Sequence, residues 1–404
     1  MRAWPTLMAG LASSPALADP LDLKPLIDAR LRYEHVEQAP ITSDADALTA
    51  RIRAGLEAKS GNVSILVESE ATLAISERYN CGLNGKTGFP LVADPQNIEL
   101  NRAQLQYRGL PKTIVTIGRQ RINLDDQRFV GSVGWRDNEQ TFDAARVEWS
   151  GVKGFRADLT YARADRTIWG VDGGNRHGPA RLPAIGGDNV FANLGYTMKL
   201  GTLTGFAYLV DQDQRLVFAN SSQTYGGRFT GTSALSRTVK LSYAASFARQ
   251  SDYHRNPNGY AASYYAGELG LGVKAFSLGG GYEVLGADKG AALTSFQTPL
   301  ATLHKFNGWA DKFLVTPPNG LRDAYGSIGY GWKRVAGFDA IGLTAVYHRF
   351  DSDRLGQRYG DEIDVQASLK RGRYSALVKY ADYSAHGFAT DTKKLWLSLE
   401  WALS

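Results

Sequence analysis

Hydrophobic and polar residues alternate with a period of two in one segment after another of this chain. In residues 47–59, Leu48 and Ile52 fall on one side of an extended strand, and Arg51 and Arg53 fall on the other. The same alternation predicts strands near residues 26–36, 47–59, 62–75, 99–109, 113–123, 141–149, 155–165, 189–198, 203–211, 222–231, 238–249, 259–271, 276–286, 324–332, 338–349, 360–370, 374–383 and 393–403. The pattern predicts an all-β protein of about eighteen strands.

Strands with this alternation occur both in soluble antiparallel sheets with one solvent-exposed face and in transmembrane β-barrels. The segments are about ten residues long, which is the length that a tilted strand needs to cross a bilayer. Short and long connections alternate, as periplasmic turns and extracellular loops do, and an even strand number leaves both termini on the periplasmic side. We therefore expect one transmembrane antiparallel β-barrel over residues 19–404, with long external loops near 76–98, 124–140, 166–188 and 287–323.

Composition supports this class and excludes others. The 404 residues include 44 Gly, 8 Trp, 20 Tyr and 16 Phe, which is too aromatic for a disordered chain. A mean hydropathy of −0.28 and the lack of any apolar run of about 18 residues argue against membrane-spanning helices. The net charge of +6 is modest and no Lys/Arg-rich tract occurs, so nothing favours nucleic-acid binding. A single cysteine, Cys81, excludes an intrachain disulfide and a multi-cysteine metal cluster.

The amino terminus reads as a secretion signal. Residues 1–18 contain one positive charge at Arg2, a short apolar centre, and the ending Ala16-Leu17-Ala18, which is an A-x-A cleavage pattern. We expect the mature chain to begin at Asp19. Export and a barrel together predict the outer membrane of a Gram-negative bacterium, where lipid and lipopolysaccharide surround the protein.

The polar face of so wide a barrel lines a lumen, and arginine is prominent on it. A belt of guanidinium groups raises the local concentration of anions in a narrow pore. Cross-strand ion pairs with interleaved acids are the plainer explanation for any single arginine. The predicted solute path consists of Arg30, Arg32, Arg51, Arg53, Arg102, Arg119, Arg121, Arg128, Arg136, Arg146, Glu57 and Asp143.

The external segment 287–323 is too apolar to remain in water. It carries Phe296 and Leu300 as well as several further aromatic residues, so it should fold on itself or into the barrel mouth as a plug or constriction, rather than pack on lipopolysaccharide. The residues predicted to form this constriction are His304, Lys305, Phe306, Trp309, Asp311, Lys312 and Phe313.

Several segments of the sequence resemble the alginate export family of outer-membrane proteins. They include Arg51-Ile-Arg-Ala-Gly-Leu-Glu57, Gly118-Arg-Gln120, Arg128-Phe-Val-Gly131, Asn138-Glu-Gln-Thr-Phe-Asp143 and, most specifically, the stretch from Thr298 to Phe313. The resemblance covers essentially the whole mature chain. It implies a monomeric eighteen-stranded barrel and, in the best-known member, an arginine-lined path for a polyuronate. The chain looks closer to the broad branch of the family than to the dedicated alginate exporter.

Other chemistry finds little support in the sequence. There is no Gly-x-Ser-x-Gly elbow, no P-loop and no metal-binding spacing, so we expect no catalytic residues, no cofactor and no metal. We expect a channel for passive passage of an anionic saccharide or similar acidic solute. The alternatives are an unselective porin, an uptake channel for small organic acids, or an outer-membrane lipid or saccharide hydrolase. The direction of transport and any periplasmic export partner stay open.

Overall fold

A computed structural model describes residues 20–174 and 181–403, and eighteen antiparallel β-strands form most of this part of the chain. The strands are β1 (Asp22–Gln38), β2 (Ala45–Ser60), β3 (Val63–Arg78), β4 (Asn97–Tyr107), β5 (Thr113–Gln120), β6 (Thr141–Trp149), β7 (Phe155–Arg166), β8 (Ala184–Met198), β9 (Gly201–Val210), β10 (Ser222–Ala234), β11 (Val239–Asp252), β12 (Ala261–Val273), β13 (Phe276–Leu285), β14 (Leu321–Val335), β15 (Phe338–Asp351), β16 (Arg358–Arg371), β17 (Tyr374–Ala385) and β18 (Thr392–Ala402). The loops include the short 3-10 helices η3 (Arg215–Asn220) and η4 (Leu303–Lys305). Among the described residues, no helix is both long and apolar enough to cross a membrane.

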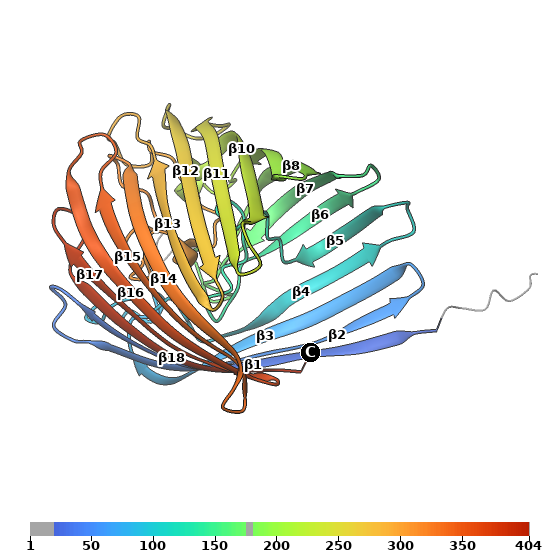
Figure 1. The fold of residues 1–404 in the computed structure, drawn as a ribbon, viewed down its shortest axis with the longest axis horizontal. Coiled ribbons are helices and arrows are strands. Elements are labelled where there is room, and N and C mark those ends of the chain that lie inside the picture. The colour runs from blue at the N-terminus through green and yellow to red at the C-terminus, as the bar shows by residue number, and fades with distance from the viewer. Residues whose placement is uncertain (1–19, 175–180, 404) are drawn as a thin grey trace, which may run out of the picture.

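The sheet closes on itself. Each strand pairs with its neighbours in the chain, and β1 also pairs with β18, from Asp28 opposite Ala402 to Gln38 opposite Thr392. Figure 1 shows the two closing strands side by side near the carboxyl end. Closure pairs every strand on both sides, which is the condition for placing strands in a bilayer. The predicted all-β fold, a single antiparallel barrel of eighteen strands, is confirmed.

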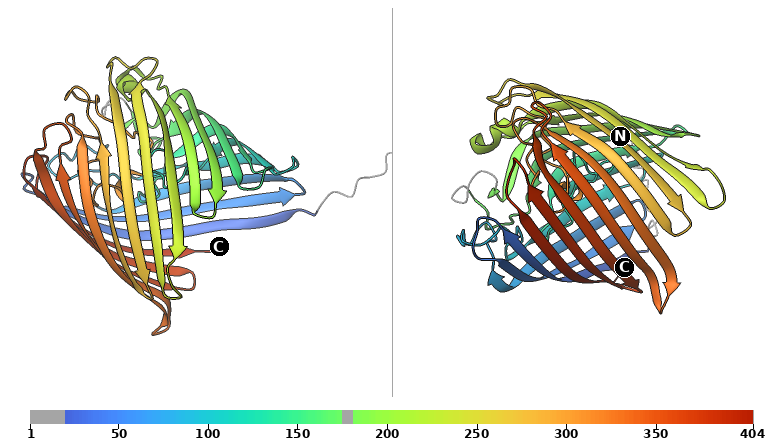
Figure 2. Two further views of the ribbon diagram at one scale, coloured as in Figure 1. Left: turned by 45° about the horizontal axis from the view of Figure 1, so that its top comes forward. Right: turned by 60° about the vertical axis from the view of Figure 1, so that its left-hand side comes forward.

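The two ends of the barrel differ in their connections. One end, here called the turn end, carries short connections such as 61–62 and 372–373, together with the start of β1 and the end of β18. The other, here called the loop end, carries the long connections 79–96, 121–140, 167–183 and 286–320, close to the predicted loops. Figure 2 shows this difference from two sides. The predicted signal peptide, residues 1–18, lies outside the described residues.

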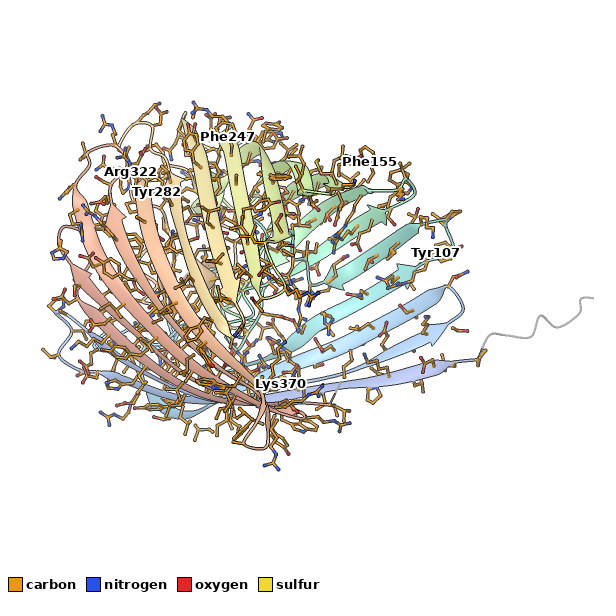
Figure 3. All side chains as sticks on the ribbon, in the orientation of Figure 1. Tyr107, Phe155, Phe247, Tyr282, Arg322 and Lys370 are labelled. Carbon is orange, nitrogen blue, oxygen red and sulfur yellow. The ribbon has the colours of Figure 1, made fainter. Side chains whose placement is uncertain are left out.

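The two faces of the wall follow the alternation in the sequence. On β3, Val63, Ile65 and Val67 point outward with 40%, 51% and 48% of their surface exposed, while Glu68 and Glu70 point inward and are buried. Outward aromatic residues gather toward both ends of the strands, as Figure 3 shows with Tyr107 and Phe155 near the turn end and Phe247 and Tyr282 nearer the loop end. An apolar outer band flanked by aromatic residues is the surface that a transmembrane barrel presents to lipid.

Two of the long loops fold inside the barrel. We call residues 121–140 the first plug loop and residues 286–320 the second plug loop. They join each other through a β-bridge between Val130 and Leu300. Their aromatic rings pack on the inner wall: Phe129 lies 5.1 Å from Phe206, and Phe313 lies 4.4 Å from Phe350. The hydrophobic core of the molecule therefore lies between these loops and the wall, within the lumen.

Candidate functional site

Nine of the ten predicted path arginines form salt bridges with carboxylates, and Arg32 is the exception. Arg30 bonds Glu400 and Asp137, Arg51 bonds Asp28, Arg53 bonds Glu70 and Glu139, Arg102 bonds Glu68, Arg119 bonds Asp143, Arg121 bonds Glu139, Arg128 bonds Glu283, Arg136 bonds Glu34, Asp94 and Asp311, and Arg146 bonds Asp158 and Glu148. Glu57 lies on β2 toward the turn end, beside a small hollow that Lys24 and Lys59 also line. The structure brings most of the predicted path residues together, but as a network of matched charges.

Arg32 has a different environment. It is 2% exposed, and no carboxylate of the described residues lies within salt-bridge distance. Its guanidinium lies 4.2 Å from the centre of the Trp135 ring and donates a 2.6 Å hydrogen bond to the Trp135 carbonyl oxygen. A desolvated cation over an indole ring is a stabilising arrangement. Arg32 therefore fastens the first plug loop to the wall.

Arg136 is the charged centre of the first plug loop. Its guanidinium donates hydrogen bonds to Glu34, Asp94 and Asp311 at 3.3, 3.3 and 3.0 Å. Burial opposes the charge on Arg136, but these three carboxylates outweigh burial and raise its pKa. Arg136 thus links β1, the loop after β3, and the second plug loop.

Asp311 has the corresponding role in the second plug loop. Its carboxylate accepts hydrogen bonds from Arg136 at 3.0 Å and Lys394 at 2.9 Å, and lies 2.7 Å from Nδ1 of His304. Burial opposes ionisation, yet Lys394, His304 and Arg136 hold the pKa of Asp311 well below its usual range. Asp311 therefore joins the second plug loop to the first plug loop and to β18.

His304 lies between Asp311 and the wall. Its ring stacks on Trp135 with centres 4.3 Å apart, and its Nε2 lies 2.8 Å from the Nζ of Lys379. Burial, with Lys379 next, lowers the pKa of His304 well below its ordinary value. The ring is therefore neutral, with Nδ1–H donating to Asp311 and Nε2 accepting from Lys379.

The remaining predicted plug residues lie at different depths. Phe313 is buried among Phe350, Tyr383 and Phe388. Trp309 lies beneath the Lys379 ammonium, which is 3.8 Å from its ring centre. Phe306 is half-buried against the Arg128 guanidinium, and the exposed Lys305 donates to the carbonyl oxygen of Asp126 at 2.7 Å.

The tip of the second plug loop sits on inward-facing carboxylates. The backbone N–H of Ala310 donates to Glu362 at 2.6 Å, and the Asn307 side chain donates to Glu283 at 2.6 Å. Gly308 has φ of +81°, and a Cβ there would lie 2.4 Å from a Glu362 oxygen, so only glycine fits. Glu362 and Glu283 are not among the site residues predicted from the sequence, although the alternation on residues 360–370 does point Glu362 inward.

A cavity of about 550 Å³ opens at the loop end between the plug loops and the wall; we call it the mouth cavity. Three cationic residues line it: Arg136, Lys312 and Lys394. Two of them, Arg136 and Lys394, form salt bridges with Asp311. Lys312 makes no hydrogen bond or ion pair with the described residues, and burial, with Lys394 next, lowers its pKa to about 8. Lys312 is therefore the cation in this cavity that remains available to a solute.

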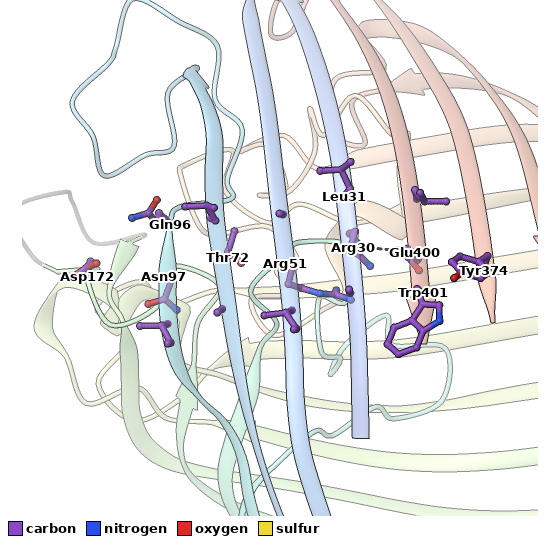
Figure 4. A pocket seen from close by; sticks show the side chains of 17 residues that line it. Arg30, Leu31, Arg51, Thr72, Gln96, Asn97, Asp172, Tyr374, Glu400 and Trp401 are labelled. Atoms are coloured by element: carbon purple, nitrogen blue, oxygen red, sulfur yellow. Dashed lines mark hydrogen bonds and ion pairs between the residues drawn. The ribbon is translucent and has the colours of Figure 1, made fainter. Parts of the chain in front are cut away.

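A second hollow, of about 730 Å³, lies on the outer wall and is shown in Figure 4. Small outward residues, Ala29, Ala50 and Ala71, form its floor, and outward side chains such as Ile52 and Trp401 border it. These outward side chains face the bilayer, while the lumen-facing residues Arg30, Arg51 and Glu400 of the same strands also border the hollow, as Figure 4 shows. The mouth cavity is the better candidate for contact with a solute.

The histidines bear on the hydrolase alternative. Among the described residues, each of the five histidines has an aspartate within hydrogen-bond distance, as His35–Asp46, His254–Asp211, His304–Asp311, His348–Asp323 and His386–Asp361. His177 lies outside the described residues. No group of three or more His, Cys, Asp or Glu in the described part is placed to hold a metal ion.

The amino-terminal part of the sequence matches a known family. Residues 27–165, from β1 to the end of β7, match the model described as alginate export. The resemblance to the alginate export family is confirmed there. The stretch from Thr298 to Phe313, given above as the most specific part of the resemblance, lies outside the matched residues. No curated protein matches the sequence of this chain.

Solved structures share the whole architecture. The chain resembles OccK9 (OpdG) of Pseudomonas aeruginosa with a TM-score of 0.70 and 16% identity, covering 95% of this chain and 99% of that one. It resembles OpdK of the same organism, solved with vanillate, with a TM-score of 0.67 and 12% identity, over 94% and 98%. It resembles OccAB4 of Acinetobacter baumannii with a TM-score of 0.66 and 11% identity, over 96% and 99%. At these identities the likeness establishes the fold. Together with the family match and the apolar outer band, it places the chain in the outer membrane of a Gram-negative bacterium.

Proposed function

We propose that this protein is an outer-membrane channel for the passive passage of acidic solutes, with the mouth cavity as their point of entry from the loop end. The observation that carries the proposal is Lys312, an ammonium group without a partner that faces a cavity of about 550 Å³ beside Arg136 and Lys394. A cavity of this size suits a small molecule rather than a flat contact. An acidic sugar or a small organic acid fits it, so the proposal covers both the anionic saccharide and the small organic acid.

The path arginines and the carboxylates paired with them contribute to this function through their combined electrostatic field. Because nine of the ten are matched by carboxylates, they do not form a free guanidinium belt. Their arrangement supports the ion-pair explanation for most of them, and it moves the expected source of anion preference to the mouth cavity. One of the similar solved structures, OpdK, was determined with vanillate, an aromatic carboxylate, which also favours an acidic solute.

The test replaces Lys312 by Gln and measures the ratio of anion to cation permeability in planar bilayers. A unit charge 4 Å from a solute charge contributes about 1 kcal/mol in water, which is roughly a fivefold change in local anion concentration. We expect the ratio to fall several-fold at about 0.1 M salt and less at about 1 M, where the screening length is ~3 Å. Because the pKa of Lys312 is about 8, the anion preference of the unchanged channel should decline as pH rises through that value, and K312Q should lose this dependence.

Lys289→Gln is the matched control. Lys289 belongs to the same loop but is exposed and does not line the mouth cavity. If K312Q and K289Q leave the permeability ratio equally unchanged, the mouth cavity does not select anions, and the unselective porin becomes the better description.

A further inference from the structure

Two residues that line the mouth cavity each carry a buried oxygen acceptor without a partner among the described residues. Asp165, at the end of β7, is 2% exposed, and Gln212, just beyond β9, is 1% exposed; both line the cavity. Neither Oδ1 of Asp165 nor Oε1 of Gln212 accepts a hydrogen bond from any described residue. A buried acceptor without a donor is unfavourable, so such atoms are normally matched by a ligand or by water.

The strand register places both side chains on the inner face. Asp165 is paired with Ile185 on β8, and Gly187, two residues further along, forms a bridge with Gln212. Positions two apart on a strand share one face of the sheet, so Asp165 and Gln212 point to the same side. Gly187 permits this close approach, because a Cβ there would lie 1.8 Å from the Asp211 carbonyl oxygen.

Lys312 approaches the cavity from the other side. It belongs to the second plug loop, whose anchors Glu362 and Lys394 lie on β16 and β18, across the closed sheet from β7–β9. The mouth cavity therefore presents unpartnered acceptors on one wall and an unpartnered cation on the other. Trp169, half-buried, adds an aromatic surface to the same cavity.

We infer that Asp165 and Gln212 select solutes that carry hydroxyl groups as well as a carboxylate. In this arrangement the carboxylate binds the Lys312 ammonium, and hydroxyl groups of the solute donate hydrogen bonds to Asp165 Oδ1 and Gln212 Oε1. The Trp169 ring provides an apolar contact for the carbon skeleton. A site built to bind hydroxyl groups rejects an analogue that lacks them, because its buried acceptors then remain unpaired. The inference rests on the proposed function and names the class of acid, a hydroxylated carboxylate.

The test compares two six-carbon monocarboxylates, gluconate and hexanoate, as blockers of single-channel current added at the loop end. The unchanged channel should bind gluconate more tightly. Asp165→Leu and Gln212→Leu should each reduce the gluconate-to-hexanoate ratio about fivefold, the value of one hydrogen bond. Asp165→Asn, which keeps an acceptor oxygen, should retain most of the preference. Gln214→Leu is the control, because Gln214 also has a buried acceptor without a partner but does not line the cavity.

The outcomes separate this inference from the proposed function. If D165L and Q212L leave the ratio unchanged while K312Q weakens both acids, water satisfies the two acceptors, and the inference is wrong although the channel is anion-selective. If neither acid blocks and K312Q has no effect, the proposed function itself fails. Tighter block by a six-carbon amino acid such as norleucine than by gluconate would also overturn the inference, because Asp165 would then be a site for an ammonium group.

Discussion

Asp311→Asn should loosen the second plug loop without unfolding the barrel. The Asp311 carboxylate joins three groups from different parts of the molecule: Arg136 in the first plug loop, His304 in its own loop, and Lys394 on β18. An asparagine has nearly the same shape but carries no charge. The substitution therefore leaves the packing almost intact and removes the electrostatic attraction that these groups share.

The size of the effect follows from which partner loses its match. Arg136 keeps Glu34 and Asp94, whereas Asp311 is the carboxylate that pairs with Lys394. Leaving one buried charge unmatched costs about 3–5 kcal/mol, and we expect the lower end because one of the two cations remains paired. About 3 kcal/mol corresponds to roughly a hundredfold increase in the undocked population of the loop. The unchanged channel should hold the loop docked nearly all the time.

Single-channel recording in planar bilayers measures this population directly. D311N should show frequent steps to a larger conductance, and the purified protein should still migrate as a compact barrel before heating. Asp288→Asn, a change of the same kind at an exposed position of the same loop, should behave like the unchanged channel. If D311N shows the same conductance and the same step frequency as D288N, the loop either stays docked without Asp311 or lies outside the permeation path, and the reasoning is refuted.

Two further predictions concern protonation and the ion-pair network. The docked loop holds the pKa of His304 well below its usual value, so the contribution of His304 to docking is fully present above about pH 6.5. Below that pH the free energy of docking falls by up to about 1.4 kcal/mol per pH unit. Large-conductance steps should therefore become more frequent as pH falls, and His304→Gln should flatten that dependence. Arg53→Gln leaves Glu70, which is 0% exposed, without its main partner and should lower the temperature at which the barrel unfolds on a gel, whereas adding Glu70→Gln should recover part of the loss. No recovery in the double variant would mean that the pair is not a unit of stability.

The strands could be predicted from sequence because the signal for them is local. In each membrane-crossing strand, successive side chains must face lipid and lumen in turn, so the alternation of apolar and polar residues indicates where a strand such as Val63–Arg78 lies. The inward direction of Arg53 and Glu362 follows from the same alternation. The aromatic content of residues 287–323 likewise indicated a folded loop, since exposed apolar rings are unfavourable.

The partners of these residues could not be predicted, because they depend on contacts between distant parts of the chain. The link from Arg136 to Asp311 spans 175 residues, and the link from Lys394 to Asp311 spans 83. Alternation gives the face of a residue but not its neighbour across the lumen. Alternation therefore predicts that the arginines face the lumen and allows ion pairs for each of them, but it does not identify the paired carboxylates or place Asp165 and Gln212 at the mouth cavity.

The pairing of β1 with β18 sets the order in which the molecule can be assembled. Arg30 and Glu400 bond across this seam at 2.6 Å although 370 residues separate them in the chain. Until β18 arrives, β1 exposes a row of unpaired backbone groups, which is a template for aggregation. The anchors Glu362 and Lys394 also follow the second plug loop in the chain. The backbone of β1 and the Asp311 carboxylate of the second plug loop therefore both gain their last partners from β18, so closing the barrel and completing the anchorage of the loop are one step.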